Sequence, residues 1–399
     1  MVRFSGFARK NEPHSPFASE VCLHSESLRE SYRLSSYDII KIYQTQSFME
    51  GTISWRSPSN IAIIKYWGKH GLQLPRNPNI SFTLDKAFTE TTLYYKTKSK
   101  RQKKDEINFK FLFEGKPNEA FRLKQLKFLT TLLPVFPFLT EYDLTVSSHN
   151  SFPHSAGIAS SASSMSALAA CLCDMDFEVA GITLDESDQA DLLKKVSVVA
   201  RLGSGSACRS VYPIMAAWGV CPDIKGSSDE YAVGFGDDIH PVFKTYHDAI
   251  LIASRSEKSV SSRMGHGLME NNPFAAPRYQ QANERMSAVV AALRSGDVNV
   301  FGQILEDEAM TLHALMMTSS PSFTLLKPNT LRMIELLREW REATKLPAFF
   351  SLDAGPNLHL LFPDTIKRQV KVFITNVLKP LCEDGMVIFD KVGQGAVRL

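Results

Sequence analysis

The sequence predicts an α+β protein of two domains. The chain has 399 residues, which is long for one average domain and sufficient for two. Strand-like and helix-like patterns are mixed without a strict βαβ alternation, and this mixture favours layered α+β domains. A stretch rich in Gly, Asp and Ser at 222–240 is the best candidate for a domain boundary. We therefore expect a poorly ordered extension over 1–50, a first domain over 51–238 and a second domain over 239–399.

The first half of the chain is expected to combine several strands with two helices. Small residues over 160–175 and apolar residues at helical spacing over 185–200 predict the helices. The run rich in Lys and Arg at 96–106 is interpreted as a solvent-exposed hairpin turn. Alternating or β-rich patterns predict strands at 52–56, 60–66, 89–98, 107–113, 144–153 and 213–220.

The second half is expected to combine short apolar strands with long helices. A first strand is predicted over 248–254. Two apolar runs around a turn predict strands over 348–355 and 358–362, and after a further helix a last strand is predicted over 386–390. Helical periodicity predicts long helices at 277–295, 298–317 and 329–345.

Composition argues against several classes of function. A net charge of +3 is too weak a basic bias to indicate a nucleic-acid partner. No stretch approaches the roughly 20 apolar residues that a membrane span needs. The six cysteines form no CxxC pair, which indicates a reduced, cytoplasmic compartment. The first 50 residues are rich in serine but also carry acidic residues, which argues against a transit peptide. The histidines show no HExxH or paired spacing that predicts a metal site.

An apolar run at 60–64 ends abruptly in charge. Lys65 follows the run, and Lys69 comes four residues later in "IAIIKYWGK". Taken alone, the pattern is typical of a strand that reaches the surface and ends in two solvated lysines. The alternative is a buried strand that presents two cations to an anionic ligand.

Three segments rich in Gly and Ser are candidate anion-binding loops. "PHSAGIASSAS" (153–163) lies between a strand end and a helix start, where small residues and a helix N-terminus favour phosphate; a serine-rich N-cap is the alternative. "ARLGSGSACRS" (200–210) offers two glycines, two hydroxyls and Arg209, or else a flexible turn with a surface arginine. "SVSSRMGH" (259–266) has a similar composition, but taken alone it is better explained as a simple helix cap.

Asp353 follows an apolar strand in "LDAGPN" (352–357). A carboxylate at the end of a buried strand is costly unless it is paired or used. The residue is therefore either the former of an Asx-turn or a base or orienting acceptor for a substrate hydroxyl.

Together these segments resemble the diphosphomevalonate decarboxylase family of the GHMP kinase superfamily. The resemblance spans roughly residues 54–395 and rests on "NIAIIKYWGK", "NPNISFTL", "FPHSAGIASSAS", "ARLGSGSACRS", "VSSRMG", "DAGPN" and "KVGQGA". It implies a two-domain fold with an active-site cleft between the domains. It also implies a carboxy-lyase of the mevalonate pathway of isoprenoid and lipid biosynthesis. Such an enzyme uses ATP and Mg²⁺ to convert mevalonate 5-diphosphate into isopentenyl diphosphate, ADP, phosphate and CO₂, and the resemblance further implies a homodimer.

The resemblance also implies a role for each matched residue. Asp353 is expected to face the C3 hydroxyl of the substrate, Lys65 to lie beside Asp353 and offset negative charge, and Arg209 to hold the substrate carboxylate. Arg122, on a helix after the first strands, is a further expected substrate contact. Substrate contacts are expected at Tyr66, Trp67, Gly68, Lys69, Ser204, Gly205, Ser206, Ala207, Cys208, Arg209, Ser262 and Arg263. ATP contacts are expected at Ser155, Gly157, Ala159, Ser160, Ser161 and Ser163, with Ser161 as a candidate ligand of the Mg²⁺ that ATP carries.

Other functions on the same fold remain open. A mevalonate monophosphate decarboxylase or a 3-hydroxyl kinase would share most of these residues, and a non-catalytic nucleotide-binding protein is the alternative from another class. The joint presence of Lys65, Arg209 and Asp353 argues against a kinase that stops before CO₂ loss and against a protein without catalysis. The chain departs from the family pattern after "ACRS", where Pro213 and Ile214 replace two glycines.

Overall fold

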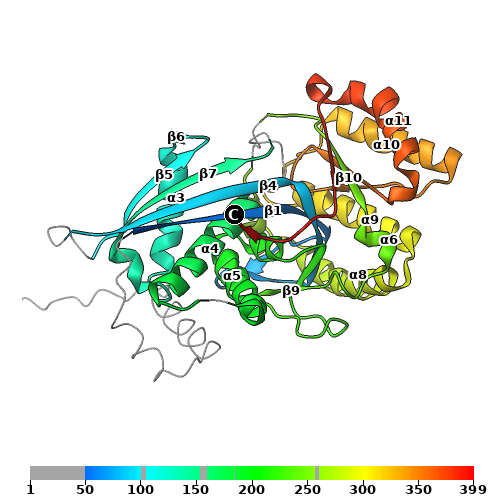
Figure 1. Cartoon of the computed structure of the whole chain (residues 1–399). Helices are drawn as coiled ribbons and strands as arrows, with labels where there is room; N and C mark the ends of the chain where they lie inside the picture. The colour runs from blue at the N-terminus through cyan, green and yellow to red at the C-terminus, as the bar shows by residue number, and fades with distance from the viewer. Residues whose placement is uncertain (1–49, 100–104, 153–159, 184, 257–259) are drawn as a thin grey trace, which may run out of the picture.

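The computed structural model describes residues 50–99, 105–152, 160–183, 185–256 and 260–399. Nearly all of the predicted extension over 1–50 lies outside these ranges. The described residues form two large sheets with helices packed on them and a small sheet of two short strands, so the α+β class is confirmed. Figure 1 shows the long strands of the first sheet in blue and cyan, with the second sheet and its orange and red helices beside one end.

The first sheet has eight strands and contains both ends of the described chain. Its two longest strands, β1 and β4, pair in antiparallel register, with irregularities after Pro58 and after Ala62. Because β1 continues through these bulges, the two strands predicted over 52–56 and 60–66 are one strand. The order is β14 (Val397–Arg398), β1 (Glu50–Ile64), β4 (Asn79–Thr97), β7 (Tyr142–Asn150), β5 (Asn108–Phe113) and β6 (Lys116–Pro117), and β8 (Met215–Trp218) pairs with β4 and β9 (Ala232–Gly234).

The hairpin predicted at 96–106 is wrong. Strands β4 and β5 flank this segment, but β7 lies between them in the sheet and pairs in parallel with β5. The prediction failed because a charged run between two strands looks the same whether the strands are neighbours or are separated by a third. Residues 100–104 of the run lie outside the described ranges.

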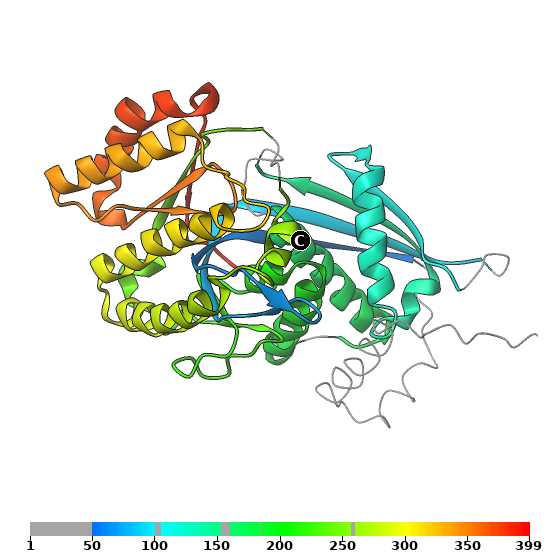
Figure 2. The ribbon, with the colours of Figure 1, turned by 180° about the vertical axis from the view of Figure 1, so that it is seen from behind.

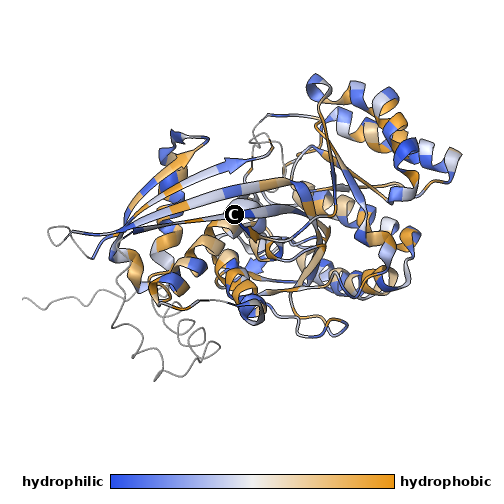
Figure 3. Cartoon of the chain, in the orientation of Figure 1, coloured by the Kyte–Doolittle hydropathy of each residue, from blue (hydrophilic) through white to orange (hydrophobic). Residues whose placement is uncertain are grey.

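Helices cover one face of the first sheet. Small side chains let α4 (Ser160–Val179) pack closely on β1 and β4, and α5 (Gln189–Gly203) packs against α4. The helix α3 (Glu119–Thr131) packs on β5. The inward faces of these helices are predominantly apolar (Figure 3). Short elements complete this part: β2 (Lys69–His70), β3 (Leu74–Pro75), η1 (Pro137–Thr140), η2 (Glu186–Asp188) and η3 (Gly205–Val211).

The second sheet has four antiparallel strands between two helical layers. Its order is β11 (Phe349–Leu352), β12 (Leu358–Phe362), β10 (His247–Leu251) and β13 (Val387–Lys391). One face packs on α8 (Ala275–Ser295) and α9 (Val298–Met317), and the other on α10 (Pro328–Thr344) and α11 (Lys367–Phe373), as Figure 2 shows from behind. The remaining elements are α6 (Pro241–Lys244), α7 (Ser262–Gly267), η4 (Asp364–Ile366), η5 (Ile374–Leu378), η6 (Lys379–Leu381) and η7 (Glu383–Gly385).

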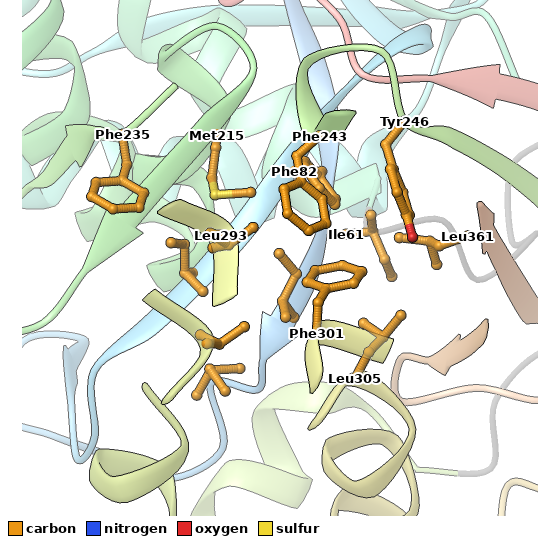
Figure 4. Packing of buried hydrophobic residues seen from close by; sticks show 14 of the residues in the cluster. Ile61, Phe82, Met215, Phe235, Phe243, Tyr246, Leu293, Phe301, Leu305 and Leu361 are labelled. Atoms are coloured by element: carbon orange, nitrogen blue, oxygen red, sulfur yellow. The ribbon is translucent and has the colours of Figure 1, made fainter. Parts of the chain in front are cut away.

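One continuous core joins the two sheets. Phe82 of β4 packs against Tyr246 and against Phe301 of α9, and Phe243 contacts both of the latter (Figure 4). Burying each such ring contributes roughly 1.5–3 kcal/mol. The core therefore fixes the end of β1 relative to α9 and the second sheet. We propose the domain boundary near residue 238, although β14 returns to the first sheet.

Candidate active site

A cavity of about 510 Å³ lies where the end of β1 meets the starts of α4 and α7, the loop after α5 and the loop after β11. It collects predicted residues that are far apart in the sequence. The predicted residues among its lining are Lys65, Tyr66, Trp67, Lys69, Ser160, Ser161, Ser204, Gly205, Ser206, Arg209, Ser262, Arg263 and Asp353.

Lys65 and Asp353 form an ion pair in the cavity. The Lys65 Nζ donates to Asp353 Oδ1 at 3.0 Å, to Ser351 Oγ at 2.8 Å and to the Ala62 carbonyl at 2.7 Å. Each of the three ammonium protons of Lys65 therefore has its own hydrogen-bond acceptor. The Asp353 side chain remains 23% exposed, whereas that of Lys65 is 3% exposed. Burial lowers the pKa of Lys65, and Asp353 opposes that shift. The pair thus presents a carboxylate with one accessible edge and a fixed cation behind it.

Arg209 lies in the wall of the same cavity, on η3. Its guanidinium donates to Ser81 Oγ at 2.9 Å, to Asn60 Oδ1 at 3.2 Å and to Asn79. These partners are neutral, and the residue is 2% exposed. The positive charge of Arg209 is therefore held in place by neutral acceptors, with no carboxylate hydrogen-bonded to it in the described part of the chain. Such an arginine is prepared to receive an anionic group.

The residues that follow Lys65 form a tightly packed wall. The Tyr66 ring packs between Trp218 and His266, and its buried hydroxyl has no hydrogen-bond partner among the described residues. Trp67 is 4% exposed and packs in an apolar cluster. Gly68 has a φ of +100°, and a Cβ there would lie 2.2 Å from the Tyr279 hydroxyl, so only glycine fits. Gly68 does not line the cavity, but it shapes the turn that leads to Lys69.

Three cations converge on the mouth of the cavity. Lys69 and Arg263 were predicted, whereas Lys124 of α3 was not. Desolvation by neighbouring protein atoms lowers the pKa of Lys69 and of Lys124, and the charge of Arg263 lowers both further. Lys69 Nζ donates to the neutral Gln73 Oε1 at 2.9 Å. Because these cations repel one another, binding of a highly charged anion among them is favourable. Arg122 does not line the cavity, and its side chain pairs with Glu119 on its own helix at 2.7 and 2.8 Å, so a substrate contact there stays a prediction.

The serine residues of the predicted ATP loop are only partly described. Ser160 and Ser161 begin α4 and line the cavity, and Ser161 Oγ lies 3.5 Å from Ser204 Oγ. Ser163 is fully buried and hydrogen-bonded to Thr89 at 2.7 Å, so its hydroxyl does not face the cavity as predicted. The helical period turns this third serine toward the sheet. Ser155, Gly157 and Ala159 lie outside the described residues.

Two predicted substrate contacts point into the core. Ala207 and Cys208 are both fully buried, and Cys208 Sγ donates to the Gly205 carbonyl at 3.0 Å. Their side chains support η3 instead of lining the cavity. In contrast, Gly205 does face the cavity, and a Cβ there would lie 2.6 Å from the Tyr66 hydroxyl. The loop motif therefore mixes cavity residues with supporting residues, which its letters alone do not distinguish.

A second, smaller cavity of about 90 Å³ adjoins the first. Both cavities share Lys124, Ser160, Ser161 and Met165, so they are neighbours at the start of α4. The smaller one is bounded by aromatic and polar side chains: Phe111, Phe113, Phe121, Gln125, Ser148, Asn150 and Ser164. Aromatic rings beside amide and hydroxyl groups suit a flat, partly polar group such as a nucleobase.

Within the described ranges, no group of three or more His, Cys, Asp or Glu side chains is arranged to hold a metal ion. The described helices also include none that is long and apolar enough to cross a membrane.

Comparison with known proteins gives consistent matches over both halves of the chain. Residues 57–231 match the diphosphomevalonate decarboxylase-like N-terminal domain, and residues 249–393 match the mevalonate 5-diphosphate decarboxylase C-terminal domain. A diphosphomevalonate decarboxylase of Ganoderma lucidum is 31% identical over 345 residues, covering 81% of this chain and 80% of that protein. One of Bos taurus is 29% identical, covering 76% and 75%.

Solved structures give the same result. Mevalonate diphosphate decarboxylase from Staphylococcus aureus matches with a TM-score of 0.73 at 28% identity, over 88% of this chain and 98% of that one. A further structure, with a TM-score of 0.72 and 28% identity over 88% of this chain and 99% of its own, is a complex with MVAPP, AMPPCP and magnesium.

Proposed function

Because this chain belongs to the diphosphomevalonate decarboxylase family, we propose that it uses ATP to decarboxylate mevalonate 5-diphosphate to isopentenyl diphosphate, releasing ADP, phosphate and CO₂. The observation that carries this proposal is the Lys65–Asp353 ion pair, 3.0 Å long, in a cavity that also holds Arg209 and a basic mouth. The fold agrees with that of related decarboxylase structures.

Asp353 is the residue proposed to act on the C3 hydroxyl. Its carboxylate has an accessible edge in the cavity, so it can accept the hydroxyl proton as the phosphoryl group of ATP attaches to the C3 oxygen. Lys65 lies on the other side of this carboxylate and offsets negative charge at the reacting phosphoryl group. When phosphate leaves C3, it takes this proton back from Asp353, and the carboxylate so regenerated stabilises the positive charge that develops at C3.

The two anionic ends of the substrate are proposed to bind at opposite parts of the cavity. Arg209 lies in the wall beside Asn60 and is suited to the substrate carboxylate, whose electrons form the alkene as CO₂ departs. Lys69, Arg263 and the newly identified Lys124 lie at the mouth and are suited to the diphosphate. Three cations at the mouth favour a diphosphate over a monophosphate tail.

ATP is proposed to bind along the start of α4. Ser160 and Ser161 place hydroxyls there, and the N-terminus of this 20-residue helix favours phosphate. The adjoining aromatic cavity would receive the adenine base. Mg²⁺ supplies charge neutralisation to the phosphates when it is bound, and oxygen donors such as the Ser161 hydroxyl fit its preference. We also propose a homodimer, on the family resemblance alone, and a cytoplasmic location, on the absence of a CxxC pair among the six cysteines.

The test is a reaction with ATP, Mg²⁺ and mevalonate 5-diphosphate in which ADP and CO₂ are measured together. Equal amounts of both products are expected. ADP without CO₂ would instead support a 3-hydroxyl kinase. Faster turnover of mevalonate monophosphate would reassign the substrate, and the absence of both products would support a non-catalytic nucleotide-binding protein.

A further inference from the structure

Glu308 is a fully buried carboxylate in the middle of α9, outside the cavity. A buried charge is costly unless it is paired and hydrogen-bonded. Glu308 Oε1 accepts from Arg278 at 2.6 Å and from Arg285 at 2.9 Å, and its Oε2 accepts from Arg278 at 2.5 Å. Burial alone would raise the pKa of Glu308, but the Arg278 charge and the hydrogen bonds from Arg278, Lys65 and Arg285 together outweigh burial and lower it. The residue is therefore anionic, with one further acceptor position on Oε2.

That position is used by the backbone of Lys65. The Lys65 N–H donates to Glu308 Oε2 at 2.9 Å, although the two residues are 243 positions apart. On the other side of the same residue, the Lys65 carbonyl accepts from Arg278 at 3.3 Å and from Asn77 Nδ2 at 3.1 Å. The Glu308–Arg278 pair therefore holds both polar backbone groups of Lys65.

The contacts to the Lys65 backbone lie just beyond the end of β1, where sheet hydrogen bonds no longer hold the chain. The register between β1 and β4 ends at Ile64, so Lys65 is the first residue after the ladder. Its side chain has all three protons directed to fixed acceptors, one of which is Asp353. A shift of the Lys65 backbone would therefore move the ammonium away from Asp353, and displacements of about 1 Å cost roughly 100-fold in rate.

We propose that Glu308, together with Arg278, is a positioning residue for Lys65: it anchors the backbone of the reactive lysine from α9 and supplies a negative charge behind it. This inference rests on the proposed function only in naming Lys65 as reactive. Because α8 and α9 also carry the second sheet, the same pair fixes Lys65 to the part of the molecule that provides Asp353. The alternative is that the ion pair only stabilises the fold.

Several charged groups lie around Lys65, and Asp353, Glu308 and Arg209 among them modify the lowering of its pKa by burial. The groups are Asp353 after β11, Glu308 on α9, Arg278 on α8, Arg209 on η3 and the buried His359–Asp248 pair of the second sheet. Glu308 favours the protonated lysine, whereas Arg209 opposes it. Replacing Glu308 by a neutral residue is therefore expected to lower the proton affinity of Lys65.

The experiment compares Glu308→Gln with Arg285→Gln. Arg285 also pairs with Glu308, but its other partners are Thr311 and Asp307 and not Lys65, so it is the matched control for loss of the network. Glu308→Gln is expected to lower kcat about 10- to 100-fold, with KM for ATP nearly unchanged. The alkaline limb of the rate profile should move about one pH unit lower. Arg285→Gln should keep kcat within about threefold, even where its melting temperature falls. Equal kcat losses in both variants, or an unmoved alkaline limb, would overturn the proposal.

A second measurement does not depend on turnover. In protein labelled with ¹³C at the lysine ε-carbon, the Lys65 resonance is identified by its absence in Lys65→Arg, and its titration is followed by NMR. The midpoint should be about one unit lower in Glu308→Gln than in the parent chain. An unchanged midpoint would refute the role of Glu308 even if the decarboxylase activity is present, and a changed one would support it even if that activity is absent. If Glu308→Gln does not fold, Arg278→Lys replaces it: the fork to Glu308 and Lys65 is lost, and kcat should fall without loss of the buried charge.

Discussion

The ammonium of Lys65 lies 3.0 Å from the carboxylate of Asp353, although 288 positions separate them in the chain. Replacing Asp353 by Asn keeps the shape of the side chain but removes the base and the anion. We expect kcat to fall about 10³-fold, while the affinity for ATP measured by calorimetry stays within about twofold. Asp307→Asn, the same change at a half-exposed position of α9, is the control and should keep the parent rate. A near-normal rate for Asp353→Asn would remove it from the mechanism.

The two lysines of "KYWGK" are expected to affect different kinetic constants. Lys65→Met removes a cation needed at the reacting phosphoryl group, so kcat should fall about 100-fold or more. Lys69→Met removes a charge-assisted contact from the cavity mouth, so KM for mevalonate diphosphate should rise about 10- to 100-fold with a smaller effect on kcat. Steady-state kinetics of both variants measures kcat and KM. If the two variants change kcat and KM in the same way, the two lysines do not have separate roles.

Lys124 provides a test of whether the substrate carries one phosphate or two. Lys124→Met should reduce kcat/KM for mevalonate diphosphate about tenfold but should affect mevalonate monophosphate much less. Lys127→Met is the matched control, because Lys127 is an exposed lysine on the same helix that does not line the cavity. If kcat/KM falls by the same factor for both substrates, Lys124 does not contact the terminal phosphate.

The sequence predicted the parts of the site that are carried by local motifs. Lys65 and Asp353 each follow a strand, and Arg209 follows a glycine loop, so local patterns marked them as candidates and the family resemblance supplied their roles. Lys124 was missed because α3 carries no motif, and only its packing on β5 brings this lysine to the cavity. Glu308 was missed because a single carboxylate in an apolar helix looks like any helical residue until its partners are known.

The distinction between local patterns and contacts of distant segments also explains which parts of the fold were predicted. Long helices and most strands were found because periodicity is a local property. The position of β7 between β4 and β5, and the pairing of β14 with β1, depend on contacts between distant segments, so no local pattern shows them.

His266 is expected to make stability depend on acid pH. It lies against the Tyr66 and Trp67 rings and accepts from the Gly68 N–H at 3.0 Å; burial, together with the Lys69 charge, lowers its pKa to about 3. Below pH 6.5 the unfolded state binds a proton that the folded state does not, so stability falls as pH decreases. The loss between pH 7 and pH 5 is about 2 kcal/mol. Urea unfolding of His266→Gln should show a flatter pH dependence over this range, and an unchanged slope would contradict the burial of a neutral imidazole.

Ile214 occupies a backbone conformation that favours glycine. Its φ is +64°, and the backbone is held there because its N–H donates to the Gly393 carbonyl at 2.9 Å and its carbonyl accepts from Thr83 at 3.0 Å. The family resemblance leads us to expect glycine here. An L-residue in this region costs roughly 1–2 kcal/mol, and both Ile214→Ala and Ile214→Gly delete the same packing apart from one methyl group. The Gly variant should therefore be more stable than the Ala variant by about 1 kcal/mol in urea unfolding. At Val233, a partly buried residue of β9 without positive φ, the order should reverse, because glycine weakens an ordinary strand. If Ala is the better replacement at both positions, the strain at Ile214 is absent.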